Sequence, residues 1–196
     1  LEELLNRHQP NVVVCTYPLF LEPLSFVFDR MGEALPLVSV ITDLVTVHTI
    51  WFNPQVDLCL VPTEEARRKA LRSGVPEDRV HVTGLPVHPR FGVEERSSSQ
   101  IRSELGWQAD LPTALIVGGK RVTGVFEIAR LIDRAGIDVQ LVIVCSTDTD
   151  MYDQLISEWW HRQVHIYGFV DNLGTLIHAS DVVISKAGGL IVSETL

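Results

Sequence analysis

The chain has 196 residues, of which 46% are hydrophobic and 21% are charged, so its composition fits a folded globular protein and excludes a disordered one. Its formal net charge of −9 argues against nucleic acid as a general partner, because duplex binding needs a clustered excess of cations. No run of residues is apolar and long enough to span a bilayer, so we predict no transmembrane segment.

Short apolar runs alternate with longer amphipathic stretches along the whole chain. The apolar runs predict strands at residues 11–15, 37–41, 56–61, 80–82, 113–117, 139–144, 164–167 and 182–184. The amphipathic stretches predict helices near residues 21–31, 63–73, 98–105, 123–135, 151–160 and 173–178. Thr63 suits a helix start because its hydroxyl can cap the first turn, and Gly74 suits the end. Alternating strands and helices predict right-handed βαβ units and parallel sheets.

A segment rich in Pro, Gly and Ser divides these elements into two sets. We predict a first Rossmann-like domain within residues 1–84, a linker at residues 85–98 and a second Rossmann-like domain at residues 99–196. The first five residues have the pattern of the last turns of a helix, and residues 193–196 that of a helix barely begun. We therefore expect the chain to be a fragment cut at both ends.

The three cysteines, Cys15, Cys59 and Cys145, lie mostly in apolar strand-like runs. Their odd number and scattered spacing do not indicate a disulfide framework or a metal site. We predict buried free thiols in a reducing compartment and no bound metal.

The most informative local pattern lies near the C-terminus, where the predicted strand 182–184 leads into Lys186-Ala187-Gly188-Gly189. Glycines at a strand end let the backbone approach a ligand, and the helix that follows offers free N–H groups and a positive dipole end to an anion. Glu194 lies about one helical turn further in, where it can accept hydrogen bonds from ribose hydroxyls. The alternative is an ordinary tight turn between a strand and a helix.

Two further loops follow predicted strands of the same domain. Gly118-Gly119-Lys120 and Arg121 follow the strand 113–117, and Gly168-Phe169-Val170 follows the strand 164–167. Open α/β sheets bind ligands beyond the C-terminal ends of their strands, so three such loops predict a nucleotide diphosphate site. Taken singly, the cations could be solvated loop residues and Phe169 could belong to the core.

These loops and the linker together resemble glycosyltransferase family 28, in its monogalactosyldiacylglycerol synthase and diacylglycerol glucosyltransferase branch. The matching motifs run in family order over nearly the whole chain. They are Thr42-Asp43-Leu44-Val45-Thr46-Val47-His48 with Trp51-Phe52, Pro62-Thr63-Glu64-Glu65, Gly84-Leu85-Pro86-Val87 with Phe91, Gly118-Gly119, Gly168-Phe169-Val170, and Lys186-Ala187-Gly188-Gly189-Leu190 with Ser193-Glu194.

The resemblance implies an α/β GT-B fold, in which two Rossmann-like parallel-sheet domains face each other across a cleft. The N-terminal domain would hold the acceptor and the membrane-facing surface, and the C-terminal domain would bind a UDP-sugar. By resemblance, uracil would contact Phe169 and Val170, ribose would bind Glu194, and the diphosphate would lie between Gly118, Gly119 and the amides of Gly188, Gly189, Leu190 and Ile191. Such enzymes invert the anomeric centre without a metal or other cofactor, so the helix dipole must offset the charge on the departing UDP.

Four positions depart from the pattern of the family. Lys120 and Val122 stand where the family usually has a small residue and a further glycine, Ile191 where it commonly has threonine, and His88 where an arginine often follows the Pro-Val pair. At the first loop, the side chains either block the backbone approach or supply direct charge to phosphate through Lys120 and Arg121.

The acceptor-side candidates are Asp43 and His48, which follow the predicted strand 37–41. A neutral alcohol is a weak nucleophile, so these side chains could position its hydroxyl or assist its deprotonation. The alternative is that Asp43 caps a turn and His48 is a satisfied polar residue. Trp51 and Phe52 are expected in the core more than at a lipid interface, and the cations at 67–69 and 72 on a solvated helix face. Trp159, Trp160 and His161 are expected to be packing residues.

Our leading hypothesis is an inverting glycosyltransferase that moves a hexose from a UDP-sugar to a lipid acceptor, diacylglycerol, in the cytoplasm at the membrane surface. The fragment by itself is expected to have no turnover, and transfer of labelled sugar by residues 1–196 alone would contradict this. The alternatives are a non-catalytic nucleotide-sugar binding or regulatory module and a sugar-nucleotide epimerase of GT-B architecture.

Overall fold

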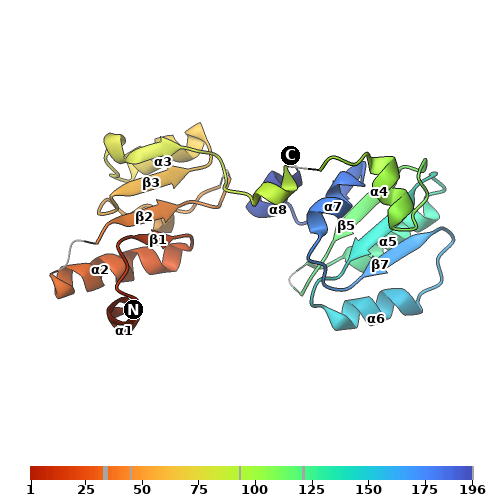
Figure 1. Ribbon diagram of the computed structural model, residues 1–196, viewed down its shortest axis with the longest axis horizontal. Coiled ribbons are helices and arrows are strands. Elements are labelled where there is room, and N and C mark those ends of the chain that lie inside the picture. Colours follow the sequence, from red (N-terminus) through yellow and green to blue (C-terminus); the bar gives the residue numbers. More distant parts are fainter. Residues whose placement is uncertain (33–34, 45, 93, 121, 196) are drawn as a thin grey trace. The chain divides into compact units, whose positions relative to one another are not determined.

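The computed structural model describes residues 1–32, 35–44, 46–92, 94–120 and 122–195. The chain forms two compact units, Leu1–Pro86 and Val87–Leu196, each with its own four-stranded parallel sheet (Figure 1). The division falls inside the segment 85–98 that the sequence indicates as a linker.

The first unit has its strands in sequence order, β1-β2-β3-β4, and every pairing is parallel. Its strands are β1 (Val13–Cys15), β2 (Leu37–Val40), β3 (Leu58–Val61) and β4 (Val80–Val82). Its helices are α1 (Glu2–His8), α2 (Leu21–Met31) and α3 (Glu64–Arg72), with the 3-10 turns η1 (Pro18–Phe20), η2 (Thr49–Trp51) and η3 (Glu77–Arg79). Since each strand is joined to its parallel neighbour by a crossover, the loops that follow the strands lie at one edge of the sheet.

The start of α3 shows how local sequence sets these elements. The Thr63 hydroxyl accepts a hydrogen bond from the Ala66 N–H at 3.2 Å, and Glu64 and Glu65 lie in the first turn next to the positive end of the helix dipole. Just after the last turn, Gly74 has a φ of +90°, a conformation that glycine adopts without strain. Both ends of the helix therefore lie where the sequence predicts them.

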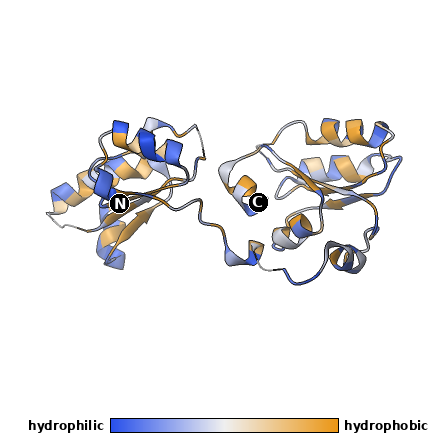
Figure 2. Cartoon of the chain, turned by 90° about the horizontal axis from the view of Figure 1, so that it is seen from above, coloured by the Kyte–Doolittle hydropathy of each residue, from blue (hydrophilic) through white to orange (hydrophobic). Residues whose placement is uncertain are grey.

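The core of the first unit packs between the sheet and its helices, which carry hydrophobic and hydrophilic residues on different sides (Figure 2). Trp51 and Phe52 belong to this core and are only 3% and 8% exposed, which confirms the expectation that they are core residues. By contrast, Val14 of β1 is 56% exposed and lines an apolar pocket of about 460 Å³ with Leu4, Tyr17 and Phe20.

The second unit has the strand order β7-β6-β5-β8, again with every pairing parallel. Its strands are β5 (Thr113–Val117), β6 (Gln140–Val144), β7 (Val164–Tyr167) and β8 (Val182–Ile184). Its helices are α4 (Ser98–Glu104), α5 (Val125–Arg134), α6 (Thr149–Ser157), α7 (Leu173–His178) and α8 (Gly189–Thr195), with the 3-10 turn η4 (Pro89–Phe91). The chain winds from β5 to β7 in one direction and then returns to place β8 on the other side of β5.

A buried arginine ties α4 to the segment that starts β8. Arg102 donates to the Ala179 carbonyl and to Asp181 Oδ2, both at 2.7 Å, and also to the carbonyls of Ala109 and Leu111. These bonds satisfy a guanidinium that is only 6% exposed. They fix where β8 enters the sheet, and thus where the loop after β8 emerges.

Two further expectations have opposite outcomes. Cys15, Cys59 and Cys145 are buried free thiols, as the sequence predicts. Helix α6 ends at Ser157, so the three residues at 159–161 lie beyond it. Trp160 packs edge-on against Phe126 at 6.3 Å between ring centroids. The expectation for Trp159 is wrong, because it is 71% exposed and its ring meets that of His161 edge-on at the surface.

Candidate functional site

The second unit has a topological switch point between β5 and β8, the position where open α/β sheets bind ligands. A pocket of about 170 Å³ lies there, with walls from Val117 at the end of β5, Ile184 at the end of β8, and Thr123 and Lys186 from the loops that follow. Two of the three glycine loops that the sequence identifies, those after β5 and β8, therefore start beside the same crevice.

The first glycine of the loop after β5 is explained by packing. The Gly118 N–H donates to the Val144 carbonyl at 2.8 Å, so it has no proton left for a ligand. A Cβ at Gly118 would lie 2.7 Å from Met151 Cε and 3.2 Å from the Val144 oxygen. Gly119 has a φ of +148° and faces more open space, and Lys120 beyond it is exposed. Arg121 lies outside the described residues. Gly119 and Lys120 are thus the described residues of this loop that can meet an anion.

The loop after β8 ends in a helix start with free amides. The first hydrogen bond that closes α8 runs from the Val192 N–H to the Gly188 carbonyl at 3.1 Å. The N–H groups of Gly189, Leu190 and Ile191 precede it and have no partner within the helix. Ala187 holds a left-handed φ of +54°, and its N–H donates to the Ser185 hydroxyl, which shapes the turn before these amides.

The loop after β7 exposes an aromatic ring. Phe169 is 70% exposed, so the alternative that it is a core residue is wrong. Val170 beside it is partly buried and packs against the core cluster on the α7 side of the sheet. An exposed ring at the C-terminal end of a strand offers a flat apolar surface for a nucleobase.

Glu194 lies apart from the switch-point crevice. It lines a different pocket, of about 470 Å³, together with Phe91, His178 and Ser193, and the two pockets share no lining residue. Burial raises the pKa of the Glu194 carboxyl, and the charge of Arg90 partly opposes that effect. The structure therefore brings Lys186 and Thr123 together in one pocket but leaves Glu194 in another.

In the first unit, the predicted acceptor segment follows β2 and is held against α3. The Thr63 hydroxyl donates to the Leu44 carbonyl at 3.1 Å, and the Lys69 ammonium donates to the Val47 carbonyl. Val47 itself is fully buried. These contacts hold the described residues of the segment against α3 at the C-terminal edge of the sheet.

Both acceptor-side candidates are exposed, and both already hold a structural hydrogen bond. Asp43 Oδ2 accepts from the Trp51 indole N–H at 2.7 Å. His48 Nδ1 accepts from the Ile50 N–H at 3.2 Å and so caps η2. Because Nδ1 is an acceptor, the neutral His48 ring carries its proton on Nε2. In this conformation His48 can donate a hydrogen bond to a ligand, whereas Asp43 still has a free carboxylate edge at Oδ1 among the described contacts.

The arginines of α3 form the solvated face that the sequence predicts, but the expectation is wrong for Lys69, which is partly buried and bonded to the Val47 carbonyl. Arg68 pairs with Glu65 at 2.6 Å, Arg67 pairs with Glu77 at 2.7 Å, and the carboxylates of both pairs are about half or more exposed. Surface pairs of this kind add little stability. Their partners also reduce the positive charge that this face offers to an anionic ligand.

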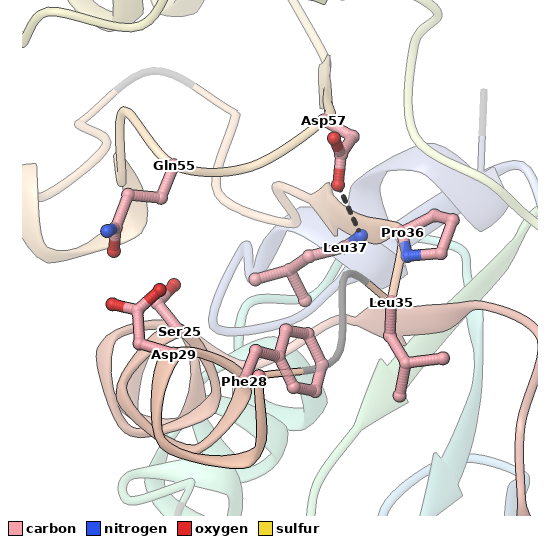
Figure 3. Close-up of a pocket in the computed structure, with 9 residues that line it drawn as sticks. Ser25, Phe28, Asp29, Leu35, Pro36, Leu37, Gln55 and Asp57 are labelled. Carbon is pink, nitrogen blue, oxygen red and sulfur yellow. Dashed lines mark hydrogen bonds between the residues drawn. The ribbon is translucent and has the colours of Figure 1, made fainter.

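The first unit also has a pocket that none of the sequence motifs predicts (Figure 3). It has a volume of about 420 Å³, and Figure 3 shows Ser25 and Asp29 of α2 across from Gln55 and Asp57. The Asp57 carboxylate accepts the Leu37 N–H at 2.8 Å, which places the pocket where β2 begins. That is the opposite edge of the sheet from Asp43, so this pocket is separate from the predicted acceptor site.

One polar residue at the C-terminal edge of the second sheet was missed by sequence reasoning. Ser146 follows β6 and has a φ of +55°, which is uncommon for a residue with a side chain. Its signal in the sequence is only its place directly after a strand, because the strain depends on the backbone conformation.

Two absences concern the described residues only. In residues 1–32, 35–44, 46–92, 94–120 and 122–195, no helix has the length and apolarity needed to cross a bilayer. Within the same ranges, no three His, Cys, Asp or Glu side chains gather in a way that could hold a metal ion.

Comparison with known proteins shows which sequences this chain resembles. The family model for monogalactosyldiacylglycerol (MGDG) synthase matches residues 1–87. The chloroplastic MGDG synthase of Spinacia oleracea is 31% identical over 202 aligned residues, which cover 98% of this chain. This chain is similar in sequence to the MGDG synthases. The resemblance that the motifs indicate is thus confirmed. The chain spans about two fifths of that relative, since the alignment covers 39% of it.

Solved structures support the fold class. The S. aureus MnaA–UDP co-structure aligns with a TM-score of 0.70 at 16% identity, over 99% of this chain and 56% of that one. The UDP-N-acetylglucosamine 2-epimerase from Rickettsia bellii aligns with a TM-score of 0.58 at 14% identity, over 98% of this chain and 55% of that one. At such identities the likeness shows the fold alone. The predicted class, two Rossmann-like parallel-sheet domains of the GT-B type, is confirmed.

Proposed function

We propose that this chain is part of an inverting glycosyltransferase that moves a hexose from a UDP-sugar to a lipid acceptor, diacylglycerol. The observation that carries the proposal is the 31% identity to an MGDG synthase across 98% of this chain. That identity extends over both units, whereas the fold is shared with an epimerase and does not distinguish the two reactions.

On the donor side, the proposal assigns the UDP to the C-terminal edge of the second sheet. The exposed ring of Phe169 would carry the uracil, with Val170 beside it. The amides that start α8, together with Lys186 and Lys120, would hold the diphosphate. Free amides and ammonium groups stabilise negative charge, which increases on the leaving UDP as the glycosidic bond to it breaks. This chemistry requires no cofactor, and we propose none.

The proposal keeps Glu194 as the ribose ligand, although it lines a separate pocket. An ionised carboxylate accepts hydrogen bonds from two hydroxyls better than a protonated one does. Because burial raises the pKa of Glu194, its carboxyl takes up a proton at a higher pH than an ordinary glutamate does, and that protonation should weaken nucleotide binding.

On the acceptor side, the contacts favour Asp43 over His48 as the proton acceptor. His48 would have to release the Ile50 N–H before Nδ1 could take a proton. Asp43 keeps Oδ1 for the acceptor hydroxyl while Oδ2 remains bonded to Trp51. We therefore propose that Asp43 takes the proton from the acceptor hydroxyl. His48 would donate a hydrogen bond to the ligand through its Nε2–H group.

The test has a binding arm and a transfer arm. Calorimetry with UDP and UDP-sugars compares the wild-type protein with Glu194→Ala and with Glu127→Ala, an exposed glutamate on α5 that serves as the control. Because residues 1–196 alone are expected to have no turnover, transfer is measured on the full-length protein that contains this chain, with labelled UDP-sugar and diacylglycerol in vesicles. We expect UDP binding that only Glu194→Ala weakens, and transfer that Asp43→Asn abolishes.

Other results would favour the alternatives. Binding without transfer to any lipid would indicate a nucleotide-sugar binding module, a reading that Lys120, Val122 and Ile191 favour because they depart from the pattern of the family. Conversion of a UDP-sugar without an acceptor would indicate an epimerase, and no UDP binding at all would refute the proposal.

We further propose that the protein acts while bound peripherally to a membrane on its cytoplasmic side, because its acceptor would be a lipid. Vesicle flotation tests this. Recovery with vesicles that contain diacylglycerol is expected, and recovery only in the soluble fraction would contradict it.

A further inference from the structure

Ser146 lies at the centre of the edge that carries the three candidate loops. It follows β6, and β6 lies between β5 and β7 in the sheet. A Cβ placed on Gly119, in the loop after β5, would be 3.6 Å from the Cβ of Ser146. A Cβ placed on Gly168, in the loop after β7, would be 4.0 Å from the Ser146 carbonyl oxygen. Ser146 thus adjoins both loops.

The backbone at Ser146 is strained and held in place from both sides. Its φ of +55° disfavours any residue with a Cβ, and glycine would adopt it without cost. The preceding amide, Cys145 N–H, donates to the Tyr167 carbonyl at 2.8 Å. Two residues later, the Asp148 carboxylate caps α6 by accepting the Met151 N–H at 3.1 Å. These contacts fix the turn. A glycine at position 146 could adopt the same backbone conformation without strain, and it would differ from the serine only in having no hydroxymethyl side chain.

The side chain has no structural task that explains the strain. Ser146 is partly exposed, and in the part of the chain that the structure describes its hydroxyl makes no hydrogen bond with another residue. A hydroxyl can both donate and accept, so it is able to bind a ribose or a phosphate oxygen.

We propose that the Ser146 hydroxyl is a further contact to the donor nucleotide, at the junction of its ribose and α-phosphate. This inference rests on the proposed function, which sets the base against Phe169 after β7 and the diphosphate at the loops after β5 and β8. A nucleotide that joins those positions passes the end of β6. Ser146 then supplies one hydrogen bond between the base and the diphosphate.

The experiment uses two substitutions that remove the hydroxyl but differ in strain. Ser146→Ala keeps the strained backbone, whereas Ser146→Gly relieves it. Ser99→Ala, on the exposed side of α4, is the matched control. Calorimetry measures the affinity for uridine, UMP and UDP, and thermal unfolding measures the melting temperature of each variant.

We expect both Ser146 variants to bind UDP about three- to tenfold more weakly, the change that one neutral hydrogen bond produces. Only Ser146→Gly should melt at a higher temperature than the wild-type protein, so its weaker binding could not be a loss of stability. A loss for UMP and UDP but not for uridine would place the contact on the α-phosphate, and a loss for all three would place it on the ribose.

Unchanged UDP affinity in both variants, with a wild-type protein that binds UDP, would overturn this inference and leave the proposed function intact. Weaker binding in Ser146→Ala alone would also overturn it, because relief of the strain would then be sufficient to restore affinity. If the wild-type protein does not bind UDP, the inference and the proposed function both fail.

Discussion

The hydrogen bond between Asp43 and Trp51 separates a structural from a catalytic role of this aspartate. The indole N–H belongs to a side chain that is 3% exposed, and its acceptor is 2.7 Å away. Asp43→Ala would leave that donor unpaired, which costs about 1–3 kcal/mol when the donor stays buried. Because Asp43 itself is exposed, water can partly replace the lost acceptor, so we expect about 1–2 kcal/mol. With a urea dependence of about 1 kcal/mol per molar, the midpoint would fall by roughly 1–2 M.

A double-mutant cycle assigns this cost to the bond itself. Unfolding of the first unit is followed in urea by circular dichroism for Asp43→Ala in the wild-type and in the Trp51→Phe background. The cost should largely disappear in the second background, which has no indole donor. Asp43→Asn retains a carbonyl acceptor and should keep most of the stability, yet it should abolish sugar transfer if the carboxylate takes the proton.

Equal destabilisation by Asp43→Ala in both backgrounds would refute the structural part of this reasoning. Transfer that continues at the wild-type rate in Asp43→Asn would refute the catalytic part.

Three more predictions concern the second unit. Arg102→Ala should destabilise the second unit by about 3 kcal/mol in urea unfolding, because the substitution removes a buried guanidinium and leaves its acceptors unpaired. A loss of stability under about 1 kcal/mol would contradict this. Gly118→Ala should lower the free energy of unfolding by about 1–3 kcal/mol, because the new Cβ meets Met151 and the Val144 oxygen. Gly168→Ala, whose new Cβ would have no neighbour closer than 4.0 Å, should be nearly neutral. Equal losses of stability in the two variants would show that packing is not the reason. Burial lowers the pKa of His165 below its ordinary 6.5, so the unfolded chain binds the proton first as the pH falls. Stability should therefore be complete above pH 6.5 and decline below it, and a His165→Phe variant that declines equally would refute this assignment.

The strands were predictable because each one coincides with a short, mostly apolar run of the sequence. Leu141 to Val144, for example, are all buried in the centre of the second sheet, as a strand covered on both faces requires. Helix ends were less certain. Helix α6 begins at Thr149, two residues before the prediction, because the Asp148 carboxylate caps it, and it ends before the tryptophan pair at 159–160.

The site was predictable in outline but not in its contacts. The glycine turns and the exposed amides of α8 follow from local sequence. That the glycine at 118 is required by Met151 depends on how α6 packs, more than thirty residues away in the chain. Phe169 is of a residue type that is usually buried, and only the tertiary structure shows that it is 70% exposed. The indole partner of Asp43 lies eight residues further along, at the end of the 3-10 turn η2.

Strand β1 has a consequence for handling the protein. Among the described residues it pairs only with β2, and Val14 within it and Val12 just before it are 56% and 46% exposed. An edge strand that is unpaired on its outer side among the described residues, and that has an apolar surface, is a template on which a second molecule can add a strand. Solutions of residues 1–196 should therefore scatter light increasingly with concentration, and a lysine in place of Val14 should suppress that growth.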